Sequence, residues 1–333
     1  MESGKKEITV TFKTITPLWT GDAWGECKEI RPSSLIGSLR FWFAFYWEII
    51  KNGKTEKLID GIPQESLTEL KDKGKVKNFQ DILKRKLTET NSLDEAIDKT
   101  LDELDLSVPS RIFGCTGWKS RVKILIESYS VTEIDFNGIE FRFPLDRLSL
   151  NSRFWIKKTL FNKDIKKLKL FKNIKVKLVT TNYWWNKYLR DFFEFSKDKL
   201  ILVGGKNSFG FGFVNLSIKD STTIDKYSSI KNNVIVKKIE NIPYSGRKKV
   251  LGFNFKYYLR KLENKKHREK IFGKQKVASK IYISNLLEEK NNSIYLLLLN
   301  NPFSRDGKIL NDVYYRKILE SLTGDKDEYK KKA

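Results

Sequence analysis

A short motif that occurs twice constrains the fold of this chain more than any other feature. Ile112-Phe-Gly is followed, six residues on from its glycine, by Ser120-Arg-Val-Lys-Ile. Ile271-Phe-Gly is followed at the same spacing by Ser279-Lys-Ile-Tyr-Ile. Both copies also come after a stretch of helical spacing that contains a Leu-Arg pair. An ungapped match in the same local context predicts an internal duplication.

The periodicity around the two copies predicts which elements each unit contains. Alternation of apolar and polar residues predicts strands, and apolar residues three or four apart predict helices. The first unit gives the βαββαβ order of ferredoxin-like, or RRM-type, domains. Strands are predicted at 7–14, 121–132, 137–143, 174–180, 213–218, 233–240, 280–284 and 293–299, and helices at 33–50, 152–171, 183–197, 251–264 and 312–322.

We therefore predict an α+β protein with two tandem ferredoxin-like domains. The first is expected to cover residues 1–220, with a helical insertion at about 52–105 and a glycine-rich loop at 203–214. The second is expected to cover 221–333 and to be partly degenerate, because neither a second glycine loop nor a clear final strand follows its last predicted helix. A length of 333 residues suits two domains of ordinary size.

The charge of the chain indicates what kind of partner it binds. Lys and Arg number 65 against 41 Asp and Glu, a formal net charge of +24, and the chain contains 8 Trp, 13 Tyr and 22 Phe. Basic side chains neutralise phosphates, and exposed rings stack on unpaired bases, so this combination favours nucleic-acid binding. The alternative is that the charge keeps the protein soluble and the rings form the core, where most of them belong.

Composition also argues against several functional classes. No hydrophobic run reaches the ~20 residues needed to cross a bilayer, and the N-terminus lacks the apolar segment of a signal peptide. We expect a cytoplasmic protein without a membrane partner. Cys27 and Cys115 are the only cysteines and His267 is the only histidine, so the chain offers neither a zinc-ligand spacing nor a histidine pair. We predict no cofactor and no metal site.

The stretch 30–47 is predicted to be a helix with two different faces. Pro32 is expected to end the preceding segment, and Ser33 or Ser34 to cap the first turn. Glycine inside a helix costs about 1 kcal/mol relative to alanine, so Gly37 indicates either close packing or the approach of a polar ligand such as a phosphate. The predicted core-facing residues are Leu35, Leu39, Trp42, Tyr46, Ile49 and Ile50. The opposite stripe is Ser33, Gly37, Arg40 and Ala44.

A second unusual segment, residues 202–214, carries four glycines between a helix and a strand. Its spacing fits neither the Walker loop nor the dinucleotide motif, both of which open a helix. A glycine-rich backbone with Lys206, Asn207 and Ser208 at its tip favours phosphate binding through successive N–H groups. The alternative is a tight turn with a bulge, which we expect to need only one or two glycines.

Together these motifs resemble the RAMP superfamily of CRISPR proteins. The resemblance rests on Thr16-Pro-Leu-Trp-Thr-Gly, Ile30-Arg-Pro-Ser-Ser-Leu-Ile-Gly-Ser-Leu-Arg-Phe-Trp, Arg111-Ile-Phe-Gly and the loop from Gly204. Within the superfamily, the second of these is most similar to subunit one of the Cmr complex, the type III-B effector. The resemblance implies a non-catalytic subunit of an antiviral ribonucleoprotein. Such a subunit binds guide RNA in its 3′ region, or the guide–target RNA duplex, and contacts other Cmr or RAMP subunits.

The resemblance also implies which residues bind RNA. The first helix and the glycine-rich loop are expected to border one surface. On that surface Arg40 and Lys206 are expected to hold one phosphate track. The predicted RNA-binding residues are Arg31, Ser33, Ser34, Gly37, Arg40, Arg111, Lys119, Arg121, Lys206, Asn207, Ser208, Phe209 and Gly210.

Two other functions fit the same resemblance. A RAMP endoribonuclease uses a histidine, here His267 in a basic stretch, or an acid in the loop after the first strand, here Asp22, Glu26 or Glu29. A scaffold subunit would use the insertion and the aromatic helix to contact other RAMP proteins without binding RNA itself. We expect the protein not to be an enzyme, because no partner acid or base is evident for the histidine.

Overall fold

Strand β1 (Lys5–Thr14) lies at the centre of the main sheet. Ile8, Val10 and Phe12 are buried and the residues between them are partly exposed, as expected for a strand with one covered face. The computed structural model describes residues 4–21, 26–59, 62–66, 68–70, 73–141, 150–161, 165–197, 199–218, 234–239, 248, 250–272, 281–285, 287–288 and 294–300.

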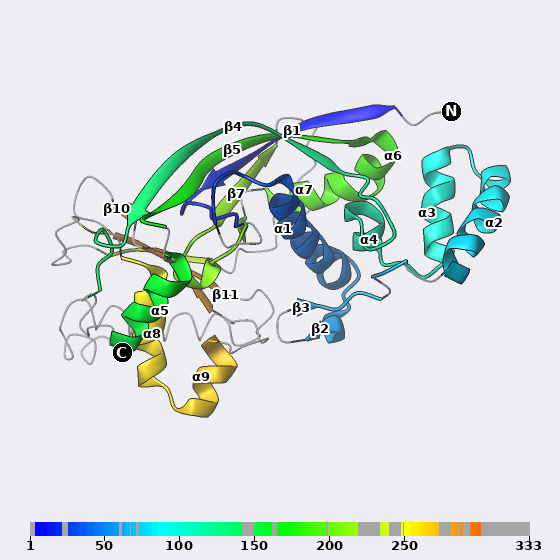
Figure 1. Cartoon of the computed structure of the whole chain (residues 1–333). Helices are drawn as coiled ribbons and strands as arrows, with labels where there is room; N and C mark the ends of the chain where they lie inside the picture. The colour runs from blue at the N-terminus through cyan, green and yellow to red at the C-terminus, as the bar shows by residue number, and fades with distance from the viewer. Residues whose placement is uncertain are drawn as a thin grey trace.

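The main sheet has five strands in the order β4-β5-β1-β7-β6, and every neighbouring pair is antiparallel (Figure 1). The other strands are β4 (Lys123–Asp135), β5 (Lys167–Thr181), β6 (Leu200–Leu202) and β7 (Phe213–Ile218). Because β1 lies between β5 and β7, with β4 beyond β5, the sheet is compatible with a ferredoxin-like βαββαβ unit. The predicted α+β class is confirmed.

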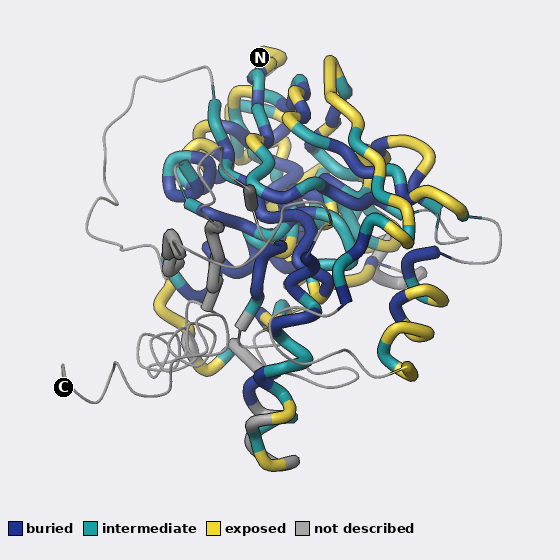
Figure 2. The backbone as a smooth tube through the Cα atoms, turned by 90° about the vertical axis from the view of Figure 1, so that its left-hand side faces the viewer, coloured by how far each residue is buried: buried dark blue, intermediate teal, exposed yellow. Residues whose placement is uncertain are grey.

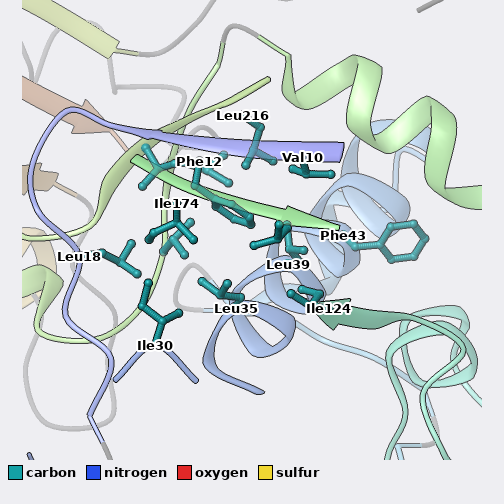
Figure 3. Close-up of a cluster of buried hydrophobic side chains, with 14 of the residues drawn as sticks. Val10, Phe12, Leu18, Ile30, Leu35, Leu39, Phe43, Ile124, Ile174 and Leu216 are labelled. Atoms are coloured by element: carbon teal, nitrogen blue, oxygen red, sulfur yellow. The ribbon is translucent and has the colours of Figure 1, made fainter. Parts of the chain in front are cut away.

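Two helical segments cover one face of this sheet. Helix α1 (Pro32–Phe45) continues into the π-helical turn η1 (Tyr46–Lys51), and the second segment is α6 (Asn182–Trp184), η3 (Trp185–Leu189) and α7 (Arg190–Ser196). Leu35, Leu39 and Phe43 point from α1 toward the β1 and β5 side chains (Figure 3). The two segments meet through rings, with Phe43 and Phe192 centred 5.4 Å apart. Figure 2 shows the resulting dark-blue interior.

Helix α1 differs from its prediction in three details. It begins at Pro32 with Arg31 as the N-cap, and no side chain caps it, so the predicted serine cap is wrong. Phe43 faces the core where Trp42 was expected, and Trp42 is only partly buried. Ala44, placed on the outer stripe by the sequence, is also buried.

The insertion after α1 is mainly helical, as predicted. A short turn η2 (Thr55–Lys57) leads to a small antiparallel pair, β2 (Leu58–Ile59) and β3 (Ile62–Pro63), that the sequence did not indicate. Helices α2 (Lys73–Glu89) and α3 (Leu93–Glu103) follow, and then α4 (Val108–Phe113). The side chain of Ser92 accepts a hydrogen bond from the Glu95 N–H and so fixes where α3 begins.

The second half contains a separate sheet. Strands β8 (Val234–Ile239), β9 (Ile281–Ile283), β10 (Leu287–Glu288) and β11 (Ile294–Asn300) form it, with β11 paired to all the others. Helices α8 (Gly252–Leu262) and α9 (Lys265–Phe272) are also described. The predicted strands and helix of 233–299 are confirmed, the predicted helix at 312–322 lies outside the described residues, and the division at residue 220 stays a prediction.

The repeated motif occupies corresponding elements in both halves. Its Ile-Phe pair ends a short helix, α4 in one copy and α9 in the other, and its last isoleucine lies on the following strand, β4 or β9. The matching residues are all buried: Leu39 and Leu259, Ile112 and Ile271, Phe113 and Phe272, Ile124 and Ile283. This shared environment is what an internal duplication predicts.

Two predicted elements in the middle of the chain are wrong. Residues 137–141 form no strand, although Ile139 and Phe141 are buried, because β4 ends at Asp135 and only Ile139 makes an isolated bridge; residues 142–143 of the predicted strand lie outside the described residues. The helix predicted at 152–171 is the shorter α5 (Leu150–Leu160), and the lysines from 167 onward belong to β5.

No helix in the described part of the chain is long and apolar enough to cross a membrane.

Candidate nucleic-acid interface

The outward face of α1 carries Ser33, Gly37 and Phe41, and all three are exposed. Apart from the backbone of α1 itself, no atom of the described residues lies within 4 Å of the position that a Cβ on Gly37 would occupy. Close packing against the described part of the chain therefore does not explain this glycine. The remaining explanation from the sequence, a ligand that approaches the helix, is compatible with the open space.

The glycine-rich loop lies directly beside this face. The Ser38 side chain accepts a hydrogen bond from the Gly204 N–H at 3.0 Å, and the Trp42 indole donates to the Leu202 carbonyl at 2.8 Å. Because Ser38 and Trp42 flank the outward stripe of α1, these two bonds place the loop along one side of it. The expectation that the helix and the loop border one surface is confirmed.

The loop is tightly built, and its four glycines all have structural reasons. A Cβ on Gly204 would lie 2.5 Å from the Trp19 carbonyl oxygen, and one on Gly212 would lie 2.1 Å from the Val203 carbonyl oxygen. Gly204, Gly210 and Gly212 all have positive φ, and Gly205 packs on the Trp19 ring. The expectation that a structural turn needs only one or two glycines is wrong, so glycine number is no argument for phosphate binding.

The tip of the loop presents a smaller set of groups than predicted. Ser208 is exposed, whereas Phe209 and Gly210 are buried. Phe209 stacks on Trp155 of α5 at 5.1 Å, and Gly210 lies against the backbone of Asn285. Phe209 and Gly210 thus join the loop to its surroundings. Asn207 and Ser208 are the first two residues of the short turn η4 (Asn207–Phe209). The backbone N–H groups at the start of such a turn have no hydrogen-bond acceptor within the turn itself.

Lys206 adopts a left-handed backbone conformation at the start of this turn. Its ammonium group lies 4.9 Å from the centre of the Trp19 ring and donates to the Thr159 carbonyl at 3.2 Å. Partial burial lowers the pKa of Lys206, because the charged form is partly removed from water. No carboxylate of the described residues pairs with it, so its charge stays available to an anion.

Arg40 is held by neighbouring protein groups. Its guanidinium donates to both carboxylate oxygens of Glu65, at 2.9 and 3.2 Å, to the Ser110 hydroxyl at 2.8 Å and to the Gly114 carbonyl. The prediction that Arg40 and Lys206 together hold an RNA phosphate backbone is therefore not supported for Arg40, whose guanidinium is already occupied by protein groups. Glu65 belongs to the insertion, which the helix pattern alone did not place beside α1.

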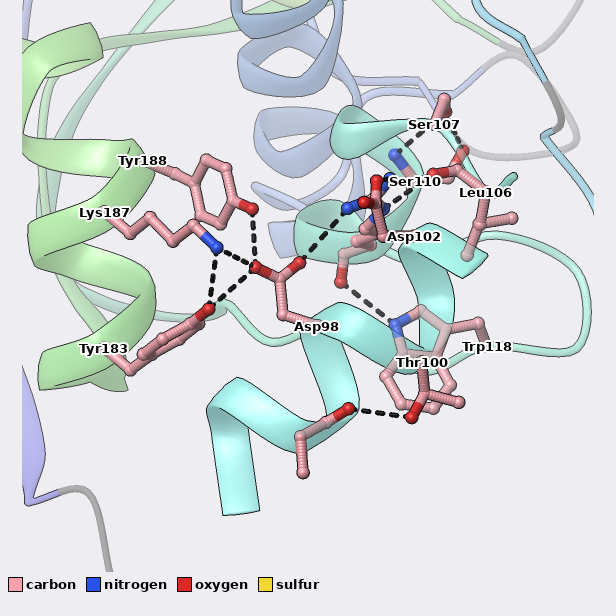
Figure 4. Close-up of polar contacts among 12 residues, drawn as sticks. Asp98, Thr100, Asp102, Leu106, Ser107, Ser110, Trp118, Tyr183, Lys187 and Tyr188 are labelled. Carbon is pink, nitrogen blue, oxygen red and sulfur yellow. Dashed lines mark hydrogen bonds and ion pairs between the residues drawn. The ribbon is translucent and has the colours of Figure 1, made fainter. Parts of the chain in front are cut away.

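Arg111 is buried and donates to a network of side chains around Asp98, which joins the insertion to the second helical segment. Figure 4 shows Asp98 with Tyr183, Lys187 and Tyr188. The Arg111 side chain donates to Asp98, to Asp102 and to the Leu106 carbonyl. Asp98 also accepts from the side chains of Tyr183, Lys187 and Tyr188, at 2.8, 2.6 and 2.6 Å. An arginine that is buried and neutralised in this way is not presented to RNA, so its place in the predicted site is corrected.

The remaining predicted residues fall into two groups. Arg31 is exposed and Ser34 partly exposed at the start of α1, beside the outward stripe. Lys119 is exposed and Arg121 partly buried on the turn after α4, where the Arg121 guanidinium lies over the Trp118 ring at 4.4 Å. Burial lowers the pKa of Arg121. The structure thus brings together the helix start and the loop tip, and RNA binding by these residues stays a prediction.

The residues named for an enzyme gain no support. Among the described residues no group of three or more His, Cys, Asp or Glu could hold a metal ion. Glu26 pairs with Lys28, and Glu29 is exposed. Asp22 and the side chain of His267 lie outside the described residues.

An α+β fold with a basic chain and an open helix face beside a glycine-rich loop defines a candidate nucleic-acid-binding protein. Residues 11–215 match the model of the RAMP superfamily, which is more than half of the 333 residues. The chain belongs to the RAMP superfamily, and this membership indicates a CRISPR-associated role in RNA binding or processing. No curated protein matched the chain in the sequence comparison.

Proposed function

We propose that this protein is a non-catalytic RNA-binding subunit of a type III-B CRISPR effector, equivalent to subunit one of the Cmr complex. It binds guide RNA in its 3′ region, or the guide–target duplex, beside other RAMP subunits. Superfamily membership supports the RNA-related role, and the helix-start motif supports the Cmr assignment.

The observation that carries the proposal is the open face of α1 at Gly37, which lies beside the tip of the glycine-rich loop. A helix tolerates a glycine poorly, and no packing within the described chain requires this one. A sugar–phosphate backbone that passes close to Gly37 would reach Arg31 and Ser33 at the start of the helix. On the loop side it would reach Lys206 and the backbone donors of Asn207 and Ser208.

Substitution of Gly37 separates an RNA contact from a structural role. Gly37→Ala should raise the free energy of unfolding by about 0.5–1 kcal/mol, because alanine favours the helix and meets no neighbour. Gly37→Glu should weaken binding of guide-length RNA by about 10- to 100-fold, because it places a carboxylate on the phosphate path. Fluorescence anisotropy at several salt concentrations and urea denaturation measure the two effects.

The matched control is Gln80→Glu, which adds the same charge at an exposed position of α2, far from α1 (Figure 1). A control with the same loss of affinity would show that only net charge matters. If Gly37→Glu binds RNA as tightly as the unmodified protein, the α1 face is not the RNA-binding surface and the proposal fails. Lys206→Ala, compared with Lys84→Ala on α2, tests the loop side in the same assay.

A further inference from the structure

Helix α5 presents apolar side chains to solvent in a way that the fold does not explain. Leu150 is 81% exposed, Phe154 is 68% exposed and Trp155 is 45% exposed, while Ile156 and Leu160 on the opposite side are buried. Leu150, Phe154 and Lys158 recur at every fourth residue and so form one outward ridge. Exposed rings of this size are a cost in water unless something covers them.

The same helix is purely basic. Its eleven residues include Arg153, Lys157 and Lys158 and no acid, and all three cations are exposed. None of the three has an ion-pair partner among the described residues. The guanidinium of Arg153 lies 5.0 Å from the centre of the Phe141 ring, and the Lys157 ammonium lies 5.5 Å from the centre of the Phe136 ring. These ring contacts orient the cations without neutralising them.

Helix α5 is joined directly to the glycine-rich loop. Trp155 stacks on Phe209 at 5.1 Å with an interplanar angle of 15°, and the Thr159 carbonyl accepts the hydrogen bond from Lys206. Lys158 is the neighbour of Thr159 in the chain and Phe154 is the neighbour of Trp155, so an RNA strand that contacts Lys206 lies close to both residues of the ridge. The ridge extends the proposed interface and is not an isolated patch.

We infer that α5 is a binding site for an unpaired stretch of RNA that leaves the glycine-rich loop. The Phe154 ring stacks on a base, and Lys157 and Lys158 contact the flanking phosphates. An aromatic ring with flanking cations on a helix without acids fits single-stranded nucleic acid. A purely protein-binding ridge would not need uncompensated cations. This inference rests on the proposed RNA-binding function and adds a second contact region to it.

Substitution of Phe154 in the full-length protein tests the stacking contact with fluorescein-labelled oligouridine. Phe154→Ala should weaken binding by about 5- to 100-fold, as expected for loss of one base–aromatic stack. Phe154→Leu should weaken it to a similar degree because it keeps an apolar side chain without a π face, and Phe154→Trp should retain full affinity. Leu93→Ala, an exposed apolar residue of α3, is the control.

The cations have a separate signature in the salt dependence. The double substitution Lys157→Ala and Lys158→Ala should reduce the slope of log affinity against log salt by about 1.4, from ~0.7 for each single-strand phosphate contact. Phe154→Ala should leave the slope unchanged. Photocrosslinking of 4-thiouridine RNA to the α5 peptide, read by mass spectrometry, gives a measurement that needs no variant.

The outcomes distinguish this inference from the proposed function. If Gly37→Glu weakens RNA binding while Phe154→Ala and Phe154→Leu do not, the α5 site is refuted and the proposed function stands. In that case the ridge is a docking surface for another protein. If the unmodified protein does not bind RNA at all, both proposals fail. Loss of affinity in Phe154→Ala with rescue in Phe154→Trp and a crosslink to α5 supports the site.

Discussion

At the scale of single residues, Arg40 shows how one neighbour decides what an arginine does. Its side chain is 23% exposed, but Glu65, itself 13% exposed, accepts hydrogen bonds from the Arg40 Nη2 nitrogen through both of its carboxylate oxygens. Such a pair is strong and directional, and removal of one member leaves a poorly solvated charge behind. Arg40 therefore fixes the insertion to the middle of α1, and its charge is not free for a phosphate.

Arg40→Ala should consequently change stability more than RNA affinity. We expect the free energy of unfolding to fall by about 2 kcal/mol, which is less than for a fully buried pair because the site is partly open to water. Urea denaturation measures the change, and Arg40→Met with Glu65→Gln should recover part of it. If Arg40→Ala had unchanged stability and at least tenfold weaker RNA binding, Arg40 would be an RNA contact and its structural role would be contradicted.

At the scale of elements, α3 is attached to the rest of the protein by its carboxylates. Asp98 is 1% exposed and accepts hydrogen bonds from three side chains of the α6–η3 segment, and Asp94 accepts from Thr181 and from the Trp184 indole at 3.1 Å. Desolvation, with the Asp98 charge as the next cause, raises the pKa of Tyr188 far above its usual range. Tyr188 thus stays a neutral donor. The insertion is a fixed part of the structure on this side.

Asp98 and Asp102 offer a matched comparison, because both contact Arg111 but only one of them is buried. Asp98→Ala should lower the free energy of unfolding by about 3–5 kcal/mol, since it leaves the buried Arg111 and two tyrosine hydroxyls short of a partner. Asp102→Ala should cost less than about 1 kcal/mol, because its side chain is 71% exposed. Thermal and urea unfolding measure both. Equal losses would contradict the structural role assigned to Asp98.

At the scale of the whole molecule, the two halves meet at the glycine-rich loop. Phe253 of α8 lies 5.4 Å from Phe209 and 5.2 Å from Trp155, so three rings from α5, the loop and α8 form one stack. Leu251 belongs to the same buried cluster as the first sheet. The backbone of Asn285 also donates to the Gly210 carbonyl at 3.4 Å. The conformation of the loop thus depends on residues of both halves.

Phe253→Ala should loosen the glycine-rich loop from a distance. We expect a loss of about 2 kcal/mol in the free energy of unfolding, because the ring is partly buried and its aromatic contacts with Trp155, Phe209 and Tyr257 disappear. Hydrogen exchange of the peptide 203–214 should become faster. Tyr257→Ala is the control, since it removes a ring that stacks on Phe253 and leaves the Phe253 ring itself in place. Unchanged exchange in Phe253→Ala would show that the first half fixes the loop alone.

The sequence by itself determined the α+β class, most of the elements and the side of α1 that faces the sheet. Periodicity reports burial over a few residues, so Leu35 and Leu39 were assigned correctly, as were the strands around β1. The predicted strand at 137–143 is not formed over its described residues, because Ile139 and Phe141 are buried without a continuous ladder and a buried irregular segment gives the same apolar pattern as a strand. The small pair β2–β3 is too short for alternation to mark it.

Only the tertiary structure decided which cations face solvent. Arg40 is neutralised by Glu65, 25 residues away, and Arg111 by Asp98, 13 residues away, and neither pairing follows from local spacing. Three glycines of the loop follow from contacts with Trp19 and Asn285, which lie far from the loop in the chain, and Gly212 follows from its contact with the Val203 carbonyl. Burial direction is a local property of a helix or strand, whereas charge compensation depends on long-range contacts. For that reason the family, the fold class and the outward position of Gly37 were readable from the sequence, whereas the neutralisation of Arg40 and the exposed α5 ridge were not.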